Sequence, residues 1–343
     1  MNKRAELPLI EPMYMTYHDG IISASLVNNP SIRNWFLSNT VILTCNRKFL
    51  SGYTSPVIRV ENYALNNTLF QTIWISMKII KGCINSVVRN LIDEGYYVNF
   101  NGVDDYYVEG KSWYKERHFS HDGTICGYDQ INKTYCIYAY DSNWIYQKFW
   151  TPQKSFNKGC LAMFRKGEYG CICAIKPKLD KVEFSIETAL KGIVDYLDSD
   201  FEKYPEEGEG NIRGIIVHEY IAKYIDKLYD GSVPYERMDR RVFRLIWEHK
   251  KIMLERIEAI EEILNLNNDI SQKYKPLVLE ADTMRMLYAS HHMKRRDSVL
   301  PIIKKKLLSL MEQEKELLTL LLEKTEGKNG NDTVEISKKQ NEF

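Results

Sequence analysis

Residues 117–141 have the sequence R-H-F-S-H-D-G-T-I-C-G-Y-D-Q-I-N-K-T-Y-C-I-Y-A-Y-D. After a largely apolar run, residues 129–133 are polar and typical of a turn, and residues 134–140 are aromatic and β-branched. This pattern predicts a β-hairpin. His121 opens its first strand and Asp141 closes its second, so antiparallel pairing can bring the two side chains opposite one another. We therefore expect Asp141 to orient the His121 imidazole, as the carboxylate does in a catalytic dyad.

The residues around this hairpin predict an α+β domain. Apolar side chains recur at i, i+3 and i+4 spacing through residues 74–92, which predicts an amphipathic helix. An alternating pattern at 96–103 predicts a strand, and residues 40–45 and 169–175 are further strand candidates. We expect residues 1–177 to form one domain in which a mostly antiparallel sheet packs against a helix.

The second half of the chain changes to a helical pattern. A helical bundle domain is expected over residues 178–326, with helices predicted at 186–197, 212–229, 240–266, 269–293 and 301–324. The last helix is rich in leucine and could serve a homodimer as readily as an intramolecular bundle. Residues 327–343 lack apolar periodicity, and we expect them to be disordered.

Composition narrows the functional classes. The 343 residues carry 47 Lys and Arg against 46 Asp and Glu, and this balance gives no charge-based reason to expect nucleic acid or an anionic membrane as partner. No apolar run of membrane-spanning length occurs, and the N-terminus has no apolar core of a secretory signal. Seven cysteines without CxxC pairs indicate reduced thiols in a cytoplasmic protein. No metal site is expected, because Ala222 stands where an H-E-x-x-H motif from His218 needs its second histidine.

Several segments together resemble the butirosin-biosynthesis-protein-H family, whose N-terminal domain is similar to the papain-like fold of bacteriocin-processing cysteine peptidases. The resemblance covers about residues 7–177 and rests on a helix ending in D-E-G, then Y-Y-V-N-F-N-G-V-D-D-Y-Y-V at 96–108, H-F-S-H-D-G-T-I-C-G-Y-D at 118–129 and a strand ending in Tyr140-Asp141. In the second half, W-E-H-K-K-I-M-L-E-R at 247–256 resembles the C-terminal extension of relatives found beside nonribosomal peptide synthetase genes.

The resemblance implies an acyltransferase of natural-product biosynthesis. Family members are similar to enzymes that take an acyl group from a carrier-protein thioester and join it to an amine, as a relative is thought to do in a polythioamide pathway. The implied partners are an acyl or peptidyl carrier protein and an amine acceptor. No cofactor is implied beyond the phosphopantetheine that the carrier protein bears. The family's catalytic histidine corresponds to His121 and its orienting carboxylate to Asp141.

The nucleophile is where this chain departs from the family. The family's cysteine stands at the start of the first helix, which here falls near His18-Asp19-Gly20 and contains no Cys. Ser23 and Ser25 are the nearest hydroxyls, and Cys45, on a predicted strand, is the nearest downstream cysteine. Ser23 and Cys45 are therefore the candidate nucleophiles, although a cysteine on a strand is more often a core thiol. The residues expected to bind substrate are His18, Asp19, Asp105, Tyr107 and His118.

Three functions remain open at this point. The first is thioester aminolysis on a carrier protein, in which His121 deprotonates or orients the amine. The second is a catalytically inactive papain-like accessory protein that binds a carrier protein or a peptide, which the missing cysteine favours. The third is a hydrolase of the cysteine-peptidase type. The plain alternative for the site itself is that His118 and His121 are polar strand-end residues and that Asp141 binds turn amides.

Overall fold

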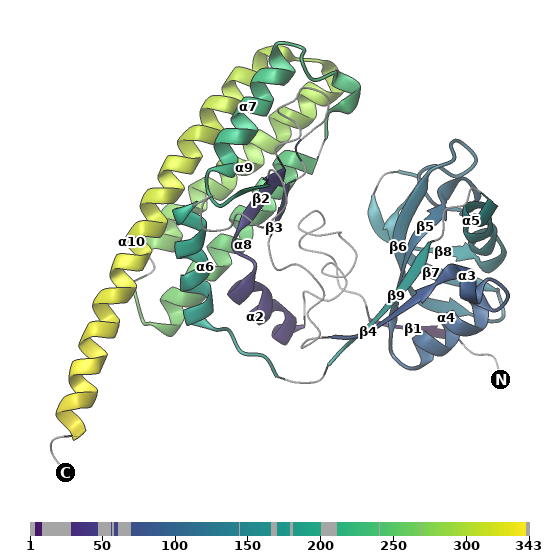
Figure 1. Cartoon of the computed structure of the whole chain (residues 1–343), viewed down its shortest axis with the longest axis horizontal. Helices are drawn as coiled ribbons and strands as arrows, with labels where there is room; N and C mark the ends of the chain where they lie inside the picture. Colours follow the sequence, from purple (N-terminus) through teal and green to yellow (C-terminus); the bar gives the residue numbers. More distant parts are fainter. Residues whose placement is uncertain are drawn as a thin grey trace. The chain divides into compact units, whose positions relative to one another are not determined.

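The computed structural model describes residues 4–8, 29–46, 56, 58–60, 70–143, 145–165, 170–178, 181–199, 211–239, 241–267 and 269–340. The chain divides into two compact units. Unit 1 comprises Met1–Arg33 and Ala64–Val182, and unit 2 comprises Asn34–Tyr63 and Glu183–Phe343. Strands dominate unit 1 and helices dominate unit 2 (Figure 1).

The described strands of unit 1 form one antiparallel sheet. Its hydrogen-bonded order is β4-β9-β5-β6-β7-β8, and β1 pairs with β6. The predicted antiparallel sheet is thereby confirmed. The strands are β1 (Arg4–Glu6), β4 (Phe70–Ser76), β5 (Tyr97–Asp104), β6 (Ser120–Asp129), β7 (Thr134–Tyr140), β8 (Tyr146–Pro152) and β9 (Cys171–Pro177).

The predicted hairpin is confirmed as β6 and β7. Thr124 lies opposite Tyr138, and the pairing continues to the turn. The Asp129 carboxylate closes that turn, because its Oδ1 atom accepts hydrogen bonds of 2.9 Å from the backbone N–H groups of Ile131 and Asn132. A short polar side chain that satisfies turn amides in this way stabilises the connection locally.

Helix α4 (Ile84–Asp93) packs against this sheet. Its buried side chains recur at i, i+3 and i+4 spacing and belong to the same core as the sheet residues: Ile84, Val88, Leu91 and Ile92. The hairpin also holds both ends of the helix. The Tyr135 hydroxyl donates a hydrogen bond of 2.6 Å to Asn85 Oδ1. The Tyr128 hydroxyl donates one of 2.6 Å to Asp93 Oδ1. Helix α5 (Gln153–Arg165) follows β8.

The helix predicted over residues 74–92 is wrong at its beginning. Trp74 lies in β4, which pairs with β9 over its full length, from Phe70 opposite Pro177 to Ser76 opposite Cys171. A short helix, α3 (Met77–Ile80), and a turn through Gly82 then precede α4. Pairing with a strand distant in sequence outweighs the local helical periodicity here.

Unit 2 combines helices with a small sheet. Its described helices are α2 (Pro30–Asn39), which spans the division between the units, α6 (Ile186–Asp198), α7 (Val217–Tyr229), α8 (Arg241–Ile263), α9 (Asp269–Lys294) and α10 (Leu300–Gln340). The sheet has the order β10-β2-β3 and consists of β2 (Leu43–Asn46), β3 (Ile58–Val60) and β10 (Asn211–Arg213). The predicted helical second half is confirmed, with this sheet as an addition.

The expected domain 1–177 is wrong in one respect, since residues 34–63 belong to unit 2. Arg256 of α8 explains this placement. Its guanidinium is fully buried and donates hydrogen bonds to the carbonyl oxygens of Leu37 at 2.6 Å and Thr40 at 2.8 Å. These acceptors lie at the end of α2, where helix carbonyls have no partner within the helix. A buried arginine with such partners fixes this segment on α8.

Helix α10 continues to Gln340, past residue 326, beyond which we expect disorder from the sequence. Extending an existing helix gains one backbone hydrogen bond per residue, so loss of the apolar pattern does not by itself end it. Among the described residues, no helix is both long enough and apolar enough to cross a membrane.

Candidate functional site

His121 forms a hydrogen-bonded pair with Asp105. The Nδ1 atom of His121 lies 3.0 Å from Oδ2 of Asp105. The Asp105 side chain is fully buried, whereas 22% of the His121 side chain is exposed. Because a carboxylate accepts the Nδ1 proton, the neutral imidazole presents an unprotonated Nε2 atom. This is the arrangement in which a carboxylate fixes the tautomer of a general base.

The backbone of β5 and β6 brings the two residues together. Val103 lies opposite His121 in the sheet. The chain then leaves β5, and the Asp105 N–H donates a hydrogen bond of 2.9 Å to the Phe119 carbonyl. Residues Asp105–Tyr107 form a short 3-10 helix, η2. Asp105 is therefore held directly after the end of β5, beside the beginning of β6.

Lys111 neutralises the buried carboxylate. Its Nζ atom lies 3.1 Å from Oδ1 of Asp105, and both side chains are completely buried. Nζ also donates a hydrogen bond of 2.7 Å to the Asp122 carbonyl. Burial lowers the pKa of Lys111, and the Asp105 carboxylate opposes that effect. A buried carboxylate needs such a partner, because an isolated buried charge is very costly.

Aromatic rings and a second carboxylate surround the His121 imidazole. The Tyr140 ring is nearly parallel to it, with centroids 6.2 Å apart and an interplanar angle of 2°. The Phe119 ring meets it edge-on at 5.3 Å. The Nε2 atom lies 3.8 Å from Oδ1 of Asp122. Nε2 therefore lies in a partly exposed site that contains aromatic rings and a second carboxylate.

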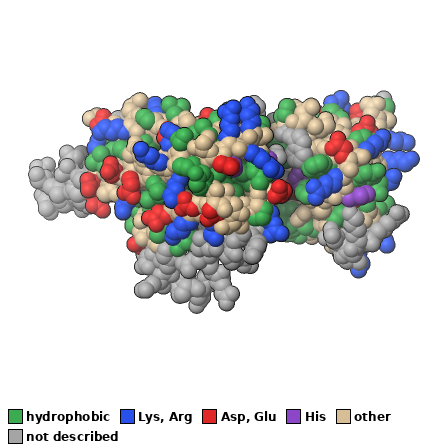
Figure 2. Space-filling model, turned by 90° about the horizontal axis from the view of Figure 1, so that it is seen from above, with side chains coloured by type: hydrophobic (Ala, Val, Ile, Leu, Met, Phe, Trp, Pro, Cys, Tyr) green, Lys and Arg blue, Asp and Glu red, His purple; other side chains and the backbone are tan. Residues whose placement is uncertain are grey.

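A second His–Asp pair lies beside the first. His118 Nδ1 is 2.8 Å from Oδ2 of Asp104, and half of the His118 side chain is exposed. The imidazole stacks on the Tyr106 ring with centroids 4.3 Å apart. Histidine side chains reach the molecular surface among Lys and Arg side chains (Figure 2). The two pairs differ in burial, and the His121 pair is backed by the buried Lys111 ammonium.

Asp141 does not orient His121, which corrects the expectation from the hairpin. Its Oδ1 atom accepts hydrogen bonds from the N–H groups of Asn143 at 2.8 Å and Ile145 at 2.9 Å. Its Oδ2 atom accepts one from the Gln147 side chain at 2.5 Å. The carboxylate thus closes the turn between β7 and β8, as short polar side chains do when they accept hydrogen bonds from nearby backbone N–H groups. Asp141 therefore binds turn amides, which was the alternative to a role in orienting His121.

Three further residues expected to bind substrate are found in unit 1. Asp105 is fully buried between His121 and Lys111, so its carboxylate orients the base and does not face solvent. Tyr107 lies in η2, with the Lys158 ammonium 4.6 Å from its ring centroid. Its ring lies 5.7 Å from that of His118. Tyr107 and His118 therefore share the exposed side of the site.

Cys45, one of the two candidate nucleophiles, belongs to unit 2, whereas His121 belongs to unit 1. Cys45 lies on β2 in unit 2, where it is buried and paired with β3 and β10. Burial raises the pKa of its thiol to about 12, so the unreactive protonated form persists at neutral pH. His18, Asp19 and Ser23 lie outside the described residues. Among the described residues, the charged and aromatic neighbours of His121 are Asp105, Asp122, Phe119 and Tyr140, and none of these four is a thiol.

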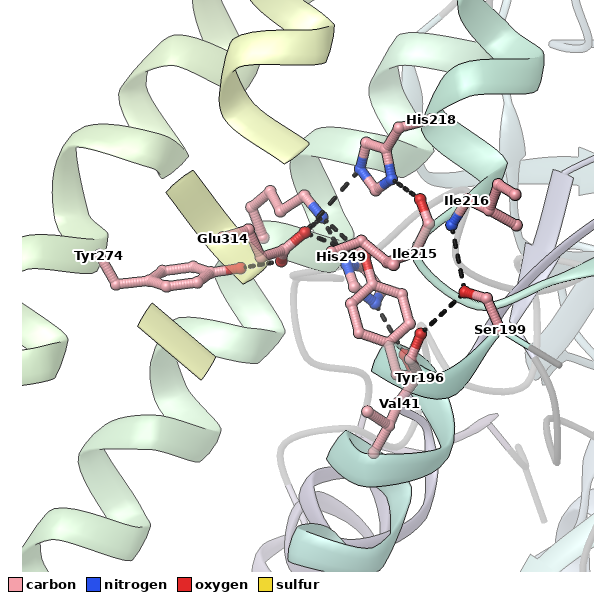
Figure 3. Close-up of polar contacts among 10 residues, drawn as sticks. Val41, Tyr196, Ser199, Ile215, Ile216, His218, His249, Tyr274 and Glu314 are labelled. Atoms are coloured by element: carbon pink, nitrogen blue, oxygen red, sulfur yellow. Dashed lines mark hydrogen bonds and ion pairs between the residues drawn. The ribbon is translucent and has the colours of Figure 1, made fainter. Parts of the chain in front are cut away.

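A second polar cluster lies in the core of unit 2, around Glu314 of α10 (Figure 3). Glu314 Oε2 is 2.5 Å from Lys250 Nζ and accepts a hydrogen bond of 2.9 Å from the Tyr196 hydroxyl. Its Oε1 atom accepts a hydrogen bond from the Tyr274 hydroxyl. All four side chains are buried, and they come from α6, α8, α9 and α10. One carboxylate therefore links four helices.

Two neutral histidines complete this cluster. The Nε2–H of His249 donates to the Val41 carbonyl at 2.8 Å, and its Nδ1 accepts from Lys250 at 3.3 Å. The His218 Nδ1–H donates to the Ile215 carbonyl at 2.7 Å. Burial and the Lys250 charge lower the pKa of His218 to about 3. Burial raises the pKa of Glu314, but the charge and hydrogen bond of Lys250, joined by the two histidines when acid protonates them, outweigh that effect and bring the pKa to about 2. The cluster is buried and its side chains come from five helices, α6 to α10.

The sequence contains one sign of this cluster, a glutamate within an apolar helix stripe, although it matches no functional motif. Glu314 falls on the apolar stripe of α10, at helical spacing from buried side chains on both sides: Leu307, Leu310, Met311, Leu318 and Leu321. A carboxylate in such a stripe needs a buried partner.

The sequence gives a weaker indication for Asp105 of the unit 1 site, since two acidic residues at a strand end also occur in ordinary turns.

No protein-family model matches the chain, and no curated protein matches it. The class of the molecule is therefore given by fold and site alone: an α+β protein whose antiparallel-sheet unit carries a carboxylate–histidine pair at its surface.

Proposed function

We propose that unit 1 is a papain-like acyl-transfer module in which His121 acts as general base. The observation that carries this proposal is the 3.0 Å contact between His121 Nδ1 and the buried Asp105 carboxylate, which leaves Nε2 partly exposed. A histidine held in this tautomer accepts a proton at Nε2 from an attacking nucleophile. The resemblance of residues 7–177 to the butirosin H-type domain supports the choice of acyl transfer.

The proposed reaction is aminolysis of an acyl thioester on a carrier protein. The amine nitrogen attacks the thioester carbonyl carbon, so that a C–N bond forms and the C–S bond breaks. His121 Nε2 takes the proton from the amine, and that proton passes to the departing thiolate. A thioester is already activated, so this reaction needs no covalent acyl-enzyme, in keeping with the lack of a thiol among the described contacts of His121.

All seven cysteines are free thiols, which supports a cytoplasmic setting for this chemistry. No cofactor of the chain's own is part of the proposal, since the carrier protein supplies the phosphopantetheine thiol.

The test uses S-acetyl-N-acetylcysteamine as the thioester and n-butylamine as the acceptor, with N-butylacetamide measured by mass spectrometry. We expect wild-type protein to form the amide faster than buffer, and His121→Gln to lose about 10²–10⁴-fold of that rate. Lys81→Gln, an exposed substitution elsewhere in unit 1, is the control, and it should stay within about threefold of wild type. Equal rates for His121→Gln and wild type would refute the base assignment.

The same lack of a thiol favours one other function, a binding protein without activity. In that case wild-type protein forms no amide from the small thioester but still binds an acylated carrier protein in a pull-down. Release of acetate in place of the amide would indicate the third function, hydrolysis.

A further inference from the structure

Tyr146 of β8 lies next to the His121 pair without being part of it. Tyr146 is the cross-strand partner of Tyr140, and their ring centroids are 5.0 Å apart. The Tyr140 ring in turn lies parallel to the His121 imidazole. Asp122, whose carboxylate is 3.8 Å from His121 Nε2, also acts electrostatically on Tyr146. The Tyr140 ring therefore lies between the base and this tyrosine.

The Tyr146 hydroxyl is buried and has no hydrogen-bond partner among the residues that the structure describes. Two other buried tyrosines of the same sheet behave differently, since the hydroxyls of Tyr128 and Tyr135 each donate a hydrogen bond of 2.6 Å to a side chain of α4. A buried hydroxyl without a partner costs folding free energy, and it is rare in folded proteins. A buried hydroxyl donor without a partner, close to a candidate catalytic pair, is therefore available to bind a group of the substrate.

The hydroxyl keeps its proton at neutral pH. Burial raises the pKa of Tyr146 well above its ordinary value, and the nearby Asp122 carboxylate raises it further. The group is therefore a donor and does not compete with His121 for a proton. A neutral donor suits a substrate oxygen on which negative charge develops during acyl transfer.

We propose that the Tyr146 hydroxyl is a catalytic residue of the same site, which donates a hydrogen bond to the carbonyl oxygen of the acyl donor while His121 accepts the amine proton. This inference rests on the proposed acyl-transfer function. The hydroxyl is buried in this structure, so the proposal requires the Tyr140 side chain, whose ring lies beside those of His121 and Tyr146, to move when the acyl donor binds. The bond forms to the oxyanion of the tetrahedral intermediate, so it acts chiefly on kcat.

The test compares Tyr146→Phe with Tyr135→Phe and Tyr128→Phe in the same amide-forming assay and in urea unfolding. Tyr146→Phe should lower kcat about 10²-fold, leave KM nearly unchanged and keep or raise the urea midpoint, because it removes an unpaired group. The two control variants should show the reverse: a lower urea midpoint, because each breaks a made hydrogen bond, and a rate within about threefold of wild type.

The outcomes separate this inference from the function on which it rests. If wild-type activity is lost in His121→Gln but kept in Tyr146→Phe, the role of Tyr146 is refuted and the acyl-transfer function stands. If wild-type protein forms no amide, both fail. If Tyr146→Phe loses activity together with stability, as the controls lose stability, the hydroxyl is a structural group and the inference is again refuted.

Discussion

The Nδ1 atom of His121 lies 3.0 Å from Oδ2 of Asp105, and the two residues are 16 positions apart in the chain. Their contact depends on the pairing of β5 with β6, and behind it the buried Lys111 ammonium balances the carboxylate. The candidate site is therefore a row of three side chains, a cation, an anion and a base, that runs from the interior to the surface of unit 1.

Breaking the buried Lys111–Asp105 ion pair should destabilise unit 1. Lys111→Met leaves the Asp105 carboxylate buried without its cation, and we expect a loss of about 3–5 kcal/mol in the free energy of unfolding. Adding Asp105→Asn removes the unpaired charge and should recover most of that loss. Urea unfolding of the two variants and wild type measures this. If Lys111→Met is as stable as wild type, the ion pair does not contribute to the stability of the fold.

Asp141 should matter for stability alone. Asp141→Ala leaves the N–H groups of Asn143 and Ile145 without their acceptor, so we expect a loss of about 2 kcal/mol in the free energy of unfolding. Ser142→Ala, in the same turn and exposed, is the control and should change the urea midpoint little. Equal midpoints for the two variants would contradict the turn-closing role.

In unit 2, Glu314 should be essential to the bundle. Glu314→Gln leaves the Lys250 ammonium buried without a counter-charge, for an expected loss of about 3–5 kcal/mol. The exposed Glu316→Gln, one-half turn further along α10, should stay within about 0.5 kcal/mol of wild type. Replacing the pair together, as Lys250→Met with Glu314→Leu, should be less harmful than Glu314→Gln. If the double variant is the least stable, the charge balance is not what stabilises the cluster.

Acid should destabilise unit 2 over a defined range of pH. The folded-state pKa of His218 is about 3 against an ordinary 6.5, so between these values the unfolded chain binds a proton that the folded chain does not. The free energy of unfolding then falls as pH falls, by about 1.4 kcal/mol per pH unit for each such proton. His249 adds to this fall in the same direction. Glu314, depressed from 4.5 to about 2, extends it below pH 4.5.

Urea unfolding followed by far-UV circular dichroism at several pH values below 7 measures this slope. His218→Gln removes one titrating group, so its stability should fall less steeply with acid than that of wild type, whatever its stability at neutral pH. Parallel curves for the variant and wild type would contradict the assignment of His218 as a buried neutral base.

The local parts of this structure could be predicted from the sequence, and the distant contacts could not. The β6–β7 hairpin and α4 follow from patterns within a few residues, namely a polar turn and an apolar stripe. The choice of Asp105 over Asp141 depends on where the chain leaves β5, which no local pattern encodes. The placement of residues 34–63 depends on Arg256, whose acceptor Leu37 is 219 residues away. Trp74 has a helical neighbourhood but lies in β4, because β9 pairs with it.

The most direct test of the central claim compares Asp105→Asn with Asp141→Asn in the thioester aminolysis assay, on samples shown by circular dichroism to be folded. An asparagine at the position that holds His121 favours the wrong tautomer, so Asp105→Asn should lose about 10²–10⁴-fold in kcat, while Asp141→Asn should keep a rate within about threefold of wild type. The opposite result, with activity lost in Asp141→Asn and kept in Asp105→Asn, would contradict the account.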